Sequence, residues 1–124
     1  MRKLLIVDDD AGLAKAYGRI GTGAGFEVRV VNDPLKATEA FLAFKPDVAV
    51  IDMIMPEKDG IDVLNEVLLT GIPVKVVLTS GFSDSYLRLA EGVAKFHENP
   101  DVSVLRKPFR RDELVELLRR LIAD

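Results

Sequence analysis

The chain has 124 residues, a net charge of −3 and a hydrophobic fraction of 48%, which suits one domain with a proper core. It has no cysteine and a single histidine, His97, so disulfides, thiolate metal sites, thiol nucleophiles and histidine pairs are excluded. The mildly acidic balance argues against direct binding to nucleic acid, which normally needs a basic surface.

No apolar run in the sequence is long enough to span a membrane. The longest runs, such as Leu4–Val7 and Val48–Ile51, are far shorter than the roughly 20 residues that a spanning helix needs. The basic start at Met1 resembles a signal peptide, but Asp8–Asp10 end the apolar run that follows it. We therefore expect a soluble, cytoplasmic protein.

In chain order, short apolar runs alternate with segments of helical spacing. The runs are rich in valine and isoleucine, which is typical of parallel strands buried on both faces. The predicted strands are Leu4–Val7, Val28–Val31, Val48–Ile51, Val74–Leu78 and Val102–Leu105. The predicted helices are Ala11–Ala24, Pro34–Phe44, Ile61–Thr70, Ser83–Phe96 and Asp112–Ala123. Five successive β-α units predict one α/β domain with a parallel sheet and helices on both faces.

Small and polar residues mark the ends of these helices. Asp10, Asp33 and Ser83 are predicted N-caps, and Gly25 is the predicted stop of the first helix. The glycine-rich segment 18–25 precedes the second strand instead of following the first, which excludes a dinucleotide-binding loop. We expect this end of the first helix to be either frayed or closely packed.

Polar side chains follow four of the predicted strands. Asp8–Asp10 follow the first strand, Asp52 the third, Thr79 and Ser80 the fourth, and Lys107 lies just after the fifth. In a sheet of this type the functional crevice lies at the carboxyl ends of the strands. We therefore expect these acids, hydroxyls and the lysine to meet at one edge of the sheet.

This combination favours a phosphoryl-transfer site with a bound metal ion. Neighbouring carboxylates repel one another unless a proton or a cation neutralises them, and oxygen ligands suit Mg²⁺ first and Mn²⁺ next. A lysine and a hydroxyl suit phosphoryl oxygens, and an aspartate can itself accept the group as an acyl phosphate. Singly, Asp10 is explained as a helix cap, Asp52 as a turn acid and Lys107 as a solvated lysine; only their joint placement favours the site.

Four motifs resemble the receiver domain of bacterial two-component response regulators, in the same order and over essentially the whole chain, residues 1–124. They are LLIVDDD at 4–10, the D-x-x-M-P-x-x-D-G block at 52–60, VLTSG at 77–81 and KPF at 107–109. The resemblance implies a doubly wound, flavodoxin-like α/β domain with five helices and a five-stranded parallel sheet in the order 2-1-3-4-5. It also implies a phosphorylation-controlled signalling switch that is not an enzyme.

Carried over to this chain, the resemblance makes Asp52 the phosphoacceptor. Asp9 and Asp52 would hold Mg²⁺ directly, with the backbone carbonyl of Ile54 as a third protein ligand. Asp8 would act mainly through a metal-bound water.

The resemblance also assigns roles on the fifth and fourth strands. Lys107 would pair with the phosphoryl group, and Thr79 would hydrogen-bond to it after transfer. The peptide bond between Lys107 and Pro108 would be cis, which X-Pro sequences tolerate. Val104 stands where family members usually carry an aromatic residue that moves on activation, so that readout does not transfer to this chain.

The implied partners are a sensor histidine kinase or histidine phosphotransfer protein and an unidentified downstream protein, with no direct contact to nucleic acid or membrane. A weak homodimer through the face of the fourth and fifth helices is a further option, which no heptad pattern demands. Segment 95–101 is longer than usual for the family, and we expect a surface insertion with His97 exposed. The chain ends after the last helix, as in a stand-alone receiver or one excised from a longer protein.

Two other functions compete with the switch. Phosphatases and phosphotransferases that work through an aspartyl phosphate usually place a second acid two residues after the nucleophile, where this chain has Ile54. A scaffold that binds partners without phosphorylation would need none of the five polar site residues. The complete set therefore favours the switch.

Overall fold

The computed structural model describes residues 1–81, 84–98 and 101–123, and only the backbone of 84–87. Its strands are β1 Lys3–Val7, β2 Glu27–Val31, β3 Val48–Asp52, β4 Lys75–Ser80 and β5 Val102–Arg106. Its helices are α1 Ala11–Gly23, α2 Ala37–Phe44, α3 Gly60–Leu69, α4 Asp84–Phe96 and α5 Arg111–Ile122, with a 3-10 turn η1 at Pro34–Lys36. All strand pairs are parallel and the order is β2-β1-β3-β4-β5, which confirms the implied topology.

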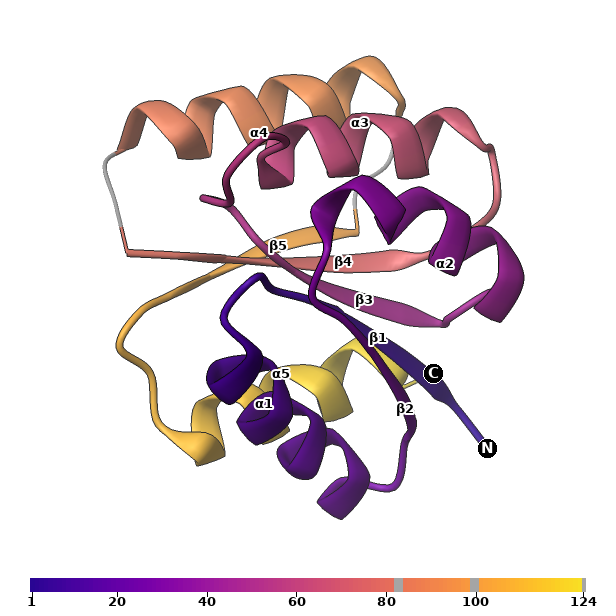
Figure 1. Ribbon diagram of the computed structural model, residues 1–124, viewed down its shortest axis with the longest axis vertical. Helices are drawn as coiled ribbons and strands as arrows, with labels where there is room; N and C mark the ends of the chain where they lie inside the picture. The colour runs from indigo at the N-terminus through magenta and orange to yellow at the C-terminus, as the bar shows by residue number, and fades with distance from the viewer. Residues whose placement is uncertain (82–83, 99–100, 124) are drawn as a thin grey trace.

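The sheet is the middle of three layers (Figure 1). Helices α1 and α5 cover one face, and α2, α3 and α4 cover the other. Leu4 and Ile6 of β1 belong to the core under α1 and α5, whereas Leu5 and Val7 belong to the core on the opposite face. A strand points successive side chains to opposite faces, so one unbroken apolar run supplies both cores.

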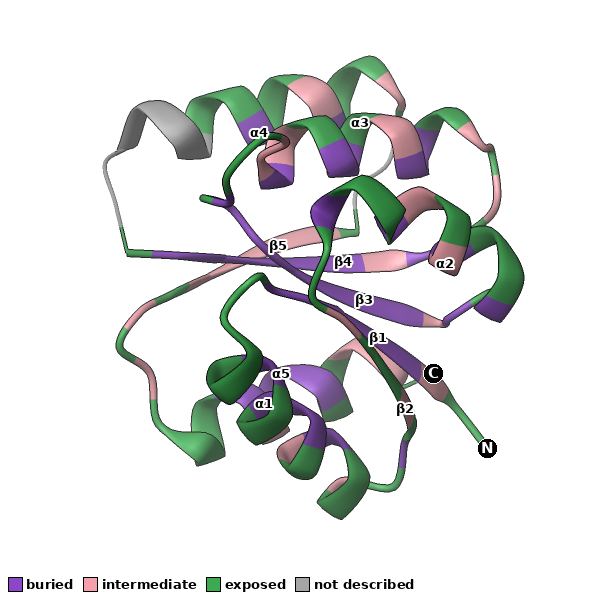
Figure 2. Cartoon of the chain, in the orientation of Figure 1, coloured by how far each residue is buried: buried purple, intermediate pink, exposed green. Residues whose placement is uncertain are grey.

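Burial of the strands falls towards the edges of the sheet (Figure 2). Strands β1, β3 and β4 are almost wholly buried, whereas Val30 of β2 is 39% exposed and β5 is half-buried. The expectation that all five runs would be buried on both faces is therefore wrong for β2 and β5. An apolar run indicates that helices cover the faces of a strand. It does not indicate whether the strand lies at the edge of the sheet, with a neighbouring strand on one side only.

Aspartate side chains cap two of the helical segments as the sequence predicts. The side chain of Asp10 accepts a hydrogen bond from the amide of Leu13 at 3.1 Å. That of Asp33 accepts from the amide of Leu35 at 3.0 Å. The third predicted cap, Ser83, lies outside the described residues.

The helix predicted over residues 34–44 is divided in two. The amide of Lys36 donates to the carbonyl of Asp33, three residues back, at 3.0 Å, which closes a 3-10 turn. The α-helix begins only at Ala37. Apolar spacing does not distinguish a tight first turn from a regular helix, which explains the difference.

The glycine-rich end of α1 is closely packed, which decides between the two expectations. A Cβ atom at Gly21 would lie 2.5 Å from Cδ2 of Leu4 and 3.1 Å from Cγ2 of Val28. Gly25 has φ +97°, in the left-handed region that favours glycine, and ends the helix as predicted. The missing side chain at Gly21 thus lets α1 lie directly on β1 and β2.

Gly21→Ala is expected to lower the free energy of unfolding by about 1–3 kcal/mol, the usual cost of overpacking a core. Gly18→Ala in the same helix is the matched control, because a Cβ there would make only ordinary contacts, at 3.4 and 3.5 Å, with Val30 and Val28. Since alanine favours helix by up to about 1 kcal/mol over glycine, the control should be at least as stable as wild type. Urea unfolding followed by circular dichroism measures both, and equal stability of the two variants would contradict the close packing.

Candidate functional site

The predicted acids meet at the carboxyl edge of the sheet. Asp8 and Asp9 directly follow β1, and Asp52 ends the neighbouring strand β3. One carboxylate oxygen from each of the three lies within 4.8 Å of the others. Asp8 is 1% and Asp52 8% exposed, whereas Asp9 is open to solvent. The cluster is therefore set into the edge of the sheet and opens outwards through Asp9.

Asp52 and Thr79 are strand residues and do not follow the strands as predicted. Asp52 pairs with Thr79 in the β3–β4 ladder, and Ser80 pairs with Arg106 in the β4–β5 ladder. Ladder hydrogen bonds use the backbone and do not depend on side-chain polarity, so strands continue past the end of an apolar run. This pairing fixes Asp52 beside the buried hydroxyl of Thr79.

Lys107 reaches the acids from the position directly after β5. Its backbone amide donates to the carbonyl of Ser80 at 2.8 Å, and its Nζ lies 3.2 Å from Oδ1 of Asp52 and 3.7 Å from Oδ2 of Asp8. Burial by itself would lower the pKa of Lys107, but the charges of Asp52 and Asp8 outweigh it and the pKa is raised. The side chain is thus held as an ammonium ion. The peptide bond to Pro108 is cis, as the resemblance implies.

Asp8 is a buried carboxylate with incomplete hydrogen bonding. Its Oδ1 accepts from the amide of Asp10 at 2.9 Å, but its Oδ2 is buried without a hydrogen-bond partner among the described residues. Burial, reinforced by the charge of Asp52, raises the pKa of Asp8 from 3.8 to about 6, against the opposing effects of the Asp10 amide and Lys107. Within the described part of the chain, the ammonium of Lys107 pairs with Asp8 and Asp52, and three clustered carboxylates beside it leave a surplus of negative charge. An all-oxygen donor set with such a surplus fits a hard divalent cation such as Mg²⁺.

Thr79 carries the second buried polar atom that lacks a partner. Its side chain is fully buried, and its Oγ1 forms no hydrogen bond within the described part of the chain. An unpaired buried hydroxyl costs free energy, so native proteins rarely keep one without a function. A group with acceptor oxygens attached to the neighbouring Asp52 would supply the missing partner.

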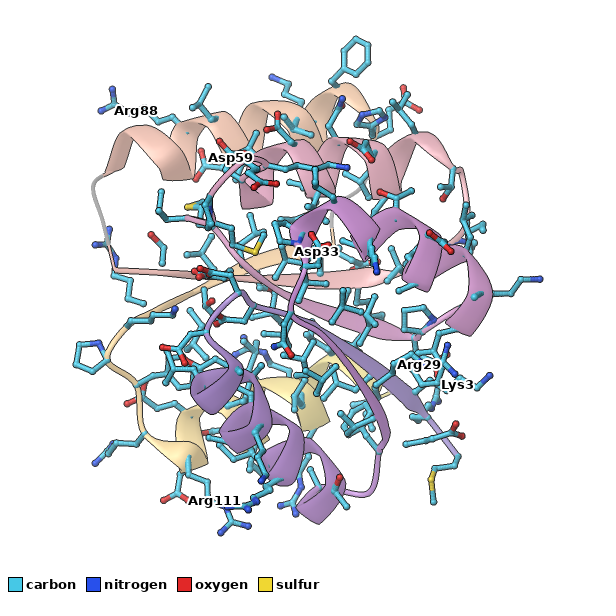
Figure 3. All side chains as sticks on the ribbon, viewed as in Figure 1. Lys3, Arg29, Asp33, Asp59, Arg88 and Arg111 are labelled. Atoms are coloured by element: carbon cyan, nitrogen blue, oxygen red, sulfur yellow. The ribbon has the colours of Figure 1, made fainter. Side chains whose placement is uncertain are left out.

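A tight loop leads from Asp52 into α3. The amide of Gly60 donates to the carbonyl of Met53 at 2.9 Å, and a Cβ atom at Gly60 would lie 2.4 Å from the carbonyl oxygen of Asp52. Helix α3 begins at Gly60, one residue before the predicted start, because Asp59 (Figure 3) and Asp62 form a capping box. The i, i+3 spacing of these two acids was the sequence signal for that start, and it was missed.

The chain matches the model of the response regulator receiver domain over residues 4–119. It belongs to this family. The receiver domain is 32% identical over 121 residues to the DNA-binding response regulator MtrA of Mycolicibacterium paratuberculosis, covering 95% of this chain and 50% of that protein. It is 33% identical over 122 residues to the response regulator MprA of Mycobacterium leprae, covering 97% and 50%. It thus spans about half the length of the curated relatives it matches.

Solved structures agree with this assignment. The chemotaxis protein CheY4 of Vibrio cholerae superposes with a TM-score of 0.87 at 22% identity, covering 98% of this chain and 99% of that one, which shows the fold. A signal receiver domain from Bermanella marisrubri superposes with a TM-score of 0.84 at 26% identity, covering 98% of each chain. The general function of this family is a phosphorylation-controlled switch in two-component systems. Its receiver domains bind Mg²⁺ in an acidic pocket and interact with histidine kinases or phosphotransfer proteins.

Two further positions singled out in the sequence, Val104 and His97, are half-buried. Val104 is half-buried and packs against the core that lies under α2, α3 and α4. His97 was expected to be exposed, which is wrong: it is half-buried, its Nε2 lies 2.8 Å from Oδ1 of Asn65, and its ring packs edge-on against Phe96. The reason is that α4 packs beside α3, which brings His97, directly after the end of α4, onto the neighbouring helix. Residues 99 and 100 of the predicted insertion lie outside the described part.

Asp8→Asn is expected to stabilise the metal-free receiver domain at neutral pH, because asparagine removes a buried charge and keeps the acceptor for Asp10. The rise in the pKa of Asp8 from 3.8 to about 6 corresponds to at most about 3 kcal/mol. A raised carboxyl pKa costs stability as the pH rises from about 4 to about 6, so the gain should vanish below about pH 4.

Thermal unfolding in the presence of a chelator, measured at several pH values, checks this expectation. Asp9→Asn removes an exposed carboxylate from the same cluster and should change stability much less. If Asp8→Asn had the stability of wild type at neutral pH, the penalty for burying Asp8 would be absent.

Proposed function

We propose that this receiver domain accepts a phosphoryl group on Asp52 in a Mg²⁺-dependent reaction with a histidine kinase or histidine phosphotransfer protein. The observation that carries the proposal is the clustering of three carboxylates within 4.8 Å, with the ammonium of Lys107 at 3.2 Å from Asp52. The sheet holds these mutually repelling carboxylates together, although the fold itself does not need acidic residues at these positions. A site for a cation and a phosphoryl group would account for the arrangement.

Asp9, Asp52 and the backbone carbonyl of Ile54 would hold Mg²⁺, with Asp8 acting mainly through a metal-bound water. The surplus negative charge and the buried Oδ2 of Asp8, which has no hydrogen-bond partner among the described residues, support this assignment. When bound, the ion neutralises charge on the phosphoryl oxygens, and Mn²⁺ has the same preference for oxygen ligands.

In the transfer, a carboxylate oxygen of Asp52 forms a bond to phosphorus while the bond from phosphorus to the donor histidine nitrogen breaks. The histidine nitrogen leaves with the electron pair. Lys107 stays protonated, because its raised pKa keeps the ammonium charged, and it binds phosphoryl oxygens. These roles of Asp52 and Lys107 need no substrate besides the phosphodonor. Ile54 stands where an aspartyl-phosphate phosphatase would carry its second acid, which favours the switch over that enzyme.

The switch would follow from the hydroxyl of Thr79. Phosphorylation gives this hydroxyl an acceptor that it lacks in the described, unphosphorylated structure. A ligand shifts a conformational equilibrium only through such a difference in interactions between two states. Val104 has no large side chain to swing, so we expect the change to involve displacement of the end of β4.

The proposed domain spans residues 1–124 and acts by changing contacts with a downstream protein. Because the curated relatives are about twice as long, a stand-alone receiver and a piece of a longer protein both fit. Among the described helices, none has the length and apolar content needed to cross a bilayer. A cytoplasmic location suits a phosphodonor of this class, and a homodimer through the α4–α5 face stays a prediction.

Incubation with acetyl phosphate and Mg²⁺ is expected to add one phosphoryl group to the wild type, as measured by intact-protein mass. Asp52→Asn should show no increment, because an amide is a poor nucleophile and cannot form the acyl phosphate. Omission of Mg²⁺ should also abolish the increment. An increment that survives in Asp52→Asn would place the acceptor on another residue, and a wild type that stays unmodified by both acetyl phosphate and a phosphorylated donor protein would favour a scaffold.

Thr79→Val is expected to stabilise the unphosphorylated protein by about 1 kcal/mol, because it removes a buried hydroxyl that has no hydrogen-bond partner. Asp52 should still be phosphorylated, but the stability gain on phosphorylation should be smaller than in the wild type. Thermal unfolding before and after phosphorylation measures both effects. Thr70→Val is the matched control and should destabilise, since the Thr70 hydroxyl donates to Val67 and accepts from the amide of Ile72. A destabilised Thr79→Val would mean that this hydroxyl is already paired.

A further inference from the structure

Lys58 ties the loop after β3 to two helices. Its Nζ lies 2.6 Å from each carboxylate oxygen of Glu66, in the second turn of α3. The hydroxyl of Thr38 in α2 donates to Oε1 of the same glutamate at 2.7 Å. The hydrogen bonds from Lys58 and Thr38 lower the pKa of Glu66, so the carboxylate stays charged. One glutamate thus joins the loop, α2 and α3.

The loop has few other polar attachments. Within the described part of the chain, the backbone amides of Ile54, Met55 and Glu57 donate no hydrogen bond, and that of Lys58 reaches only the carbonyl of Pro56 within the loop, at 2.7 Å. The buried side chain of Met55 anchors the near half of the loop in the core. The side chain of Lys58 is 15% exposed and that of Glu66 is 39% exposed, so their ion pair lies at the surface with the lysine largely covered. This pair anchors the far half of the loop.

The backbone between these two anchors is strained. Glu57 has φ +69°, in the left-handed region that residues with a side chain rarely adopt. Such a conformation persists only where neighbouring contacts hold it. The contact next along the chain is the pair between Lys58 and Glu66, so its loss would let the loop relax.

We propose that Lys58 is a positioning residue for the metal site: its pair with Glu66 holds the loop in the conformation in which the carbonyl of Ile54 serves as a ligand. This inference rests on the proposed function, which assigns that carbonyl to Mg²⁺. Lys58 acts through the backbone of the loop, and its ammonium binds Glu66 instead of the acids of the site. A pair that merely stabilised the fold would change the unfolding temperature and leave the affinity for Mg²⁺ unchanged.

Calorimetric titration of the full chain with Mg²⁺ tests the inference without any phosphorylation. Lys58→Met and Glu66→Gln are each expected to raise the dissociation constant about tenfold, the low end of the range for removing a partner that orients a metal ligand. Lys58→Arg keeps the cation and should bind Mg²⁺ as the wild type does. Lys15→Met is the matched control, since this exposed lysine of α1 has no ion pair within the described residues.

Unchanged Mg²⁺ affinity in Lys58→Met, beside a wild type that binds the ion, would overturn the inference even if the variant unfolds at a lower temperature. With acetyl phosphate as donor, the phosphorylation rate of Lys58→Met should equal that of the wild type at saturating Mg²⁺. A phosphorylation rate that stays low there would point to a role other than positioning.

If Lys58→Met binds Mg²⁺ weakly but the wild type is never phosphorylated, the inference stands and the proposed function fails. If the wild type binds no Mg²⁺, both fail.

Discussion

Repulsion among three carboxylates at the end of one parallel sheet is the constraint on which the site of this receiver domain depends. One carboxylate oxygen from each of Asp8, Asp9 and Asp52 lies within 4.8 Å of the others, and the ammonium of Lys107 pairs with Asp8 and Asp52. Two of the acids are buried, where an uncompensated charge is most costly. The strands hold them there because apolar cores on both faces of the sheet fix β1 and β3 in place. The free energy of the fold thus maintains a surplus of negative charge that a cation would relieve.

Two buried polar atoms of the site have unsatisfied hydrogen-bonding capacity. Oδ2 of Asp8 and the hydroxyl of Thr79 are both buried and lack hydrogen-bond partners among the described residues, on either side of Asp52 in the sheet. Under the proposed function, a phosphoryl group and its metal ion would supply both missing partners. A site that gains its interactions only with its ligand has the difference between states that a switch needs.

This receiver domain shares the fold and the acidic site of its family and differs in what surrounds them. Val104 stands where the family resemblance implies a mobile aromatic residue, so under the proposed function one way of carrying a signal away from Asp52 is missing. The pair between Lys58 and Glu66 connects the loop after Asp52 to α2 and α3. The surroundings of the site, more than its acids, are therefore where properties particular to this chain should be sought.

Local sequence patterns determine the order of secondary-structure elements and the candidate site residues of this protein. The alternation of apolar runs and helical spacing gave five β-α units, and residue type within the motifs pointed to Asp52, Thr79 and Lys107; the strand order came from the family resemblance. Tertiary structure alone decided which strands lie at the edges, that β4 extends to Ser80, and that Lys58 pairs with Glu66. The physical reason is that periodicity reports which face of a segment is apolar. Pairing in the sheet and contacts between elements depend on neighbours that the segment itself does not encode.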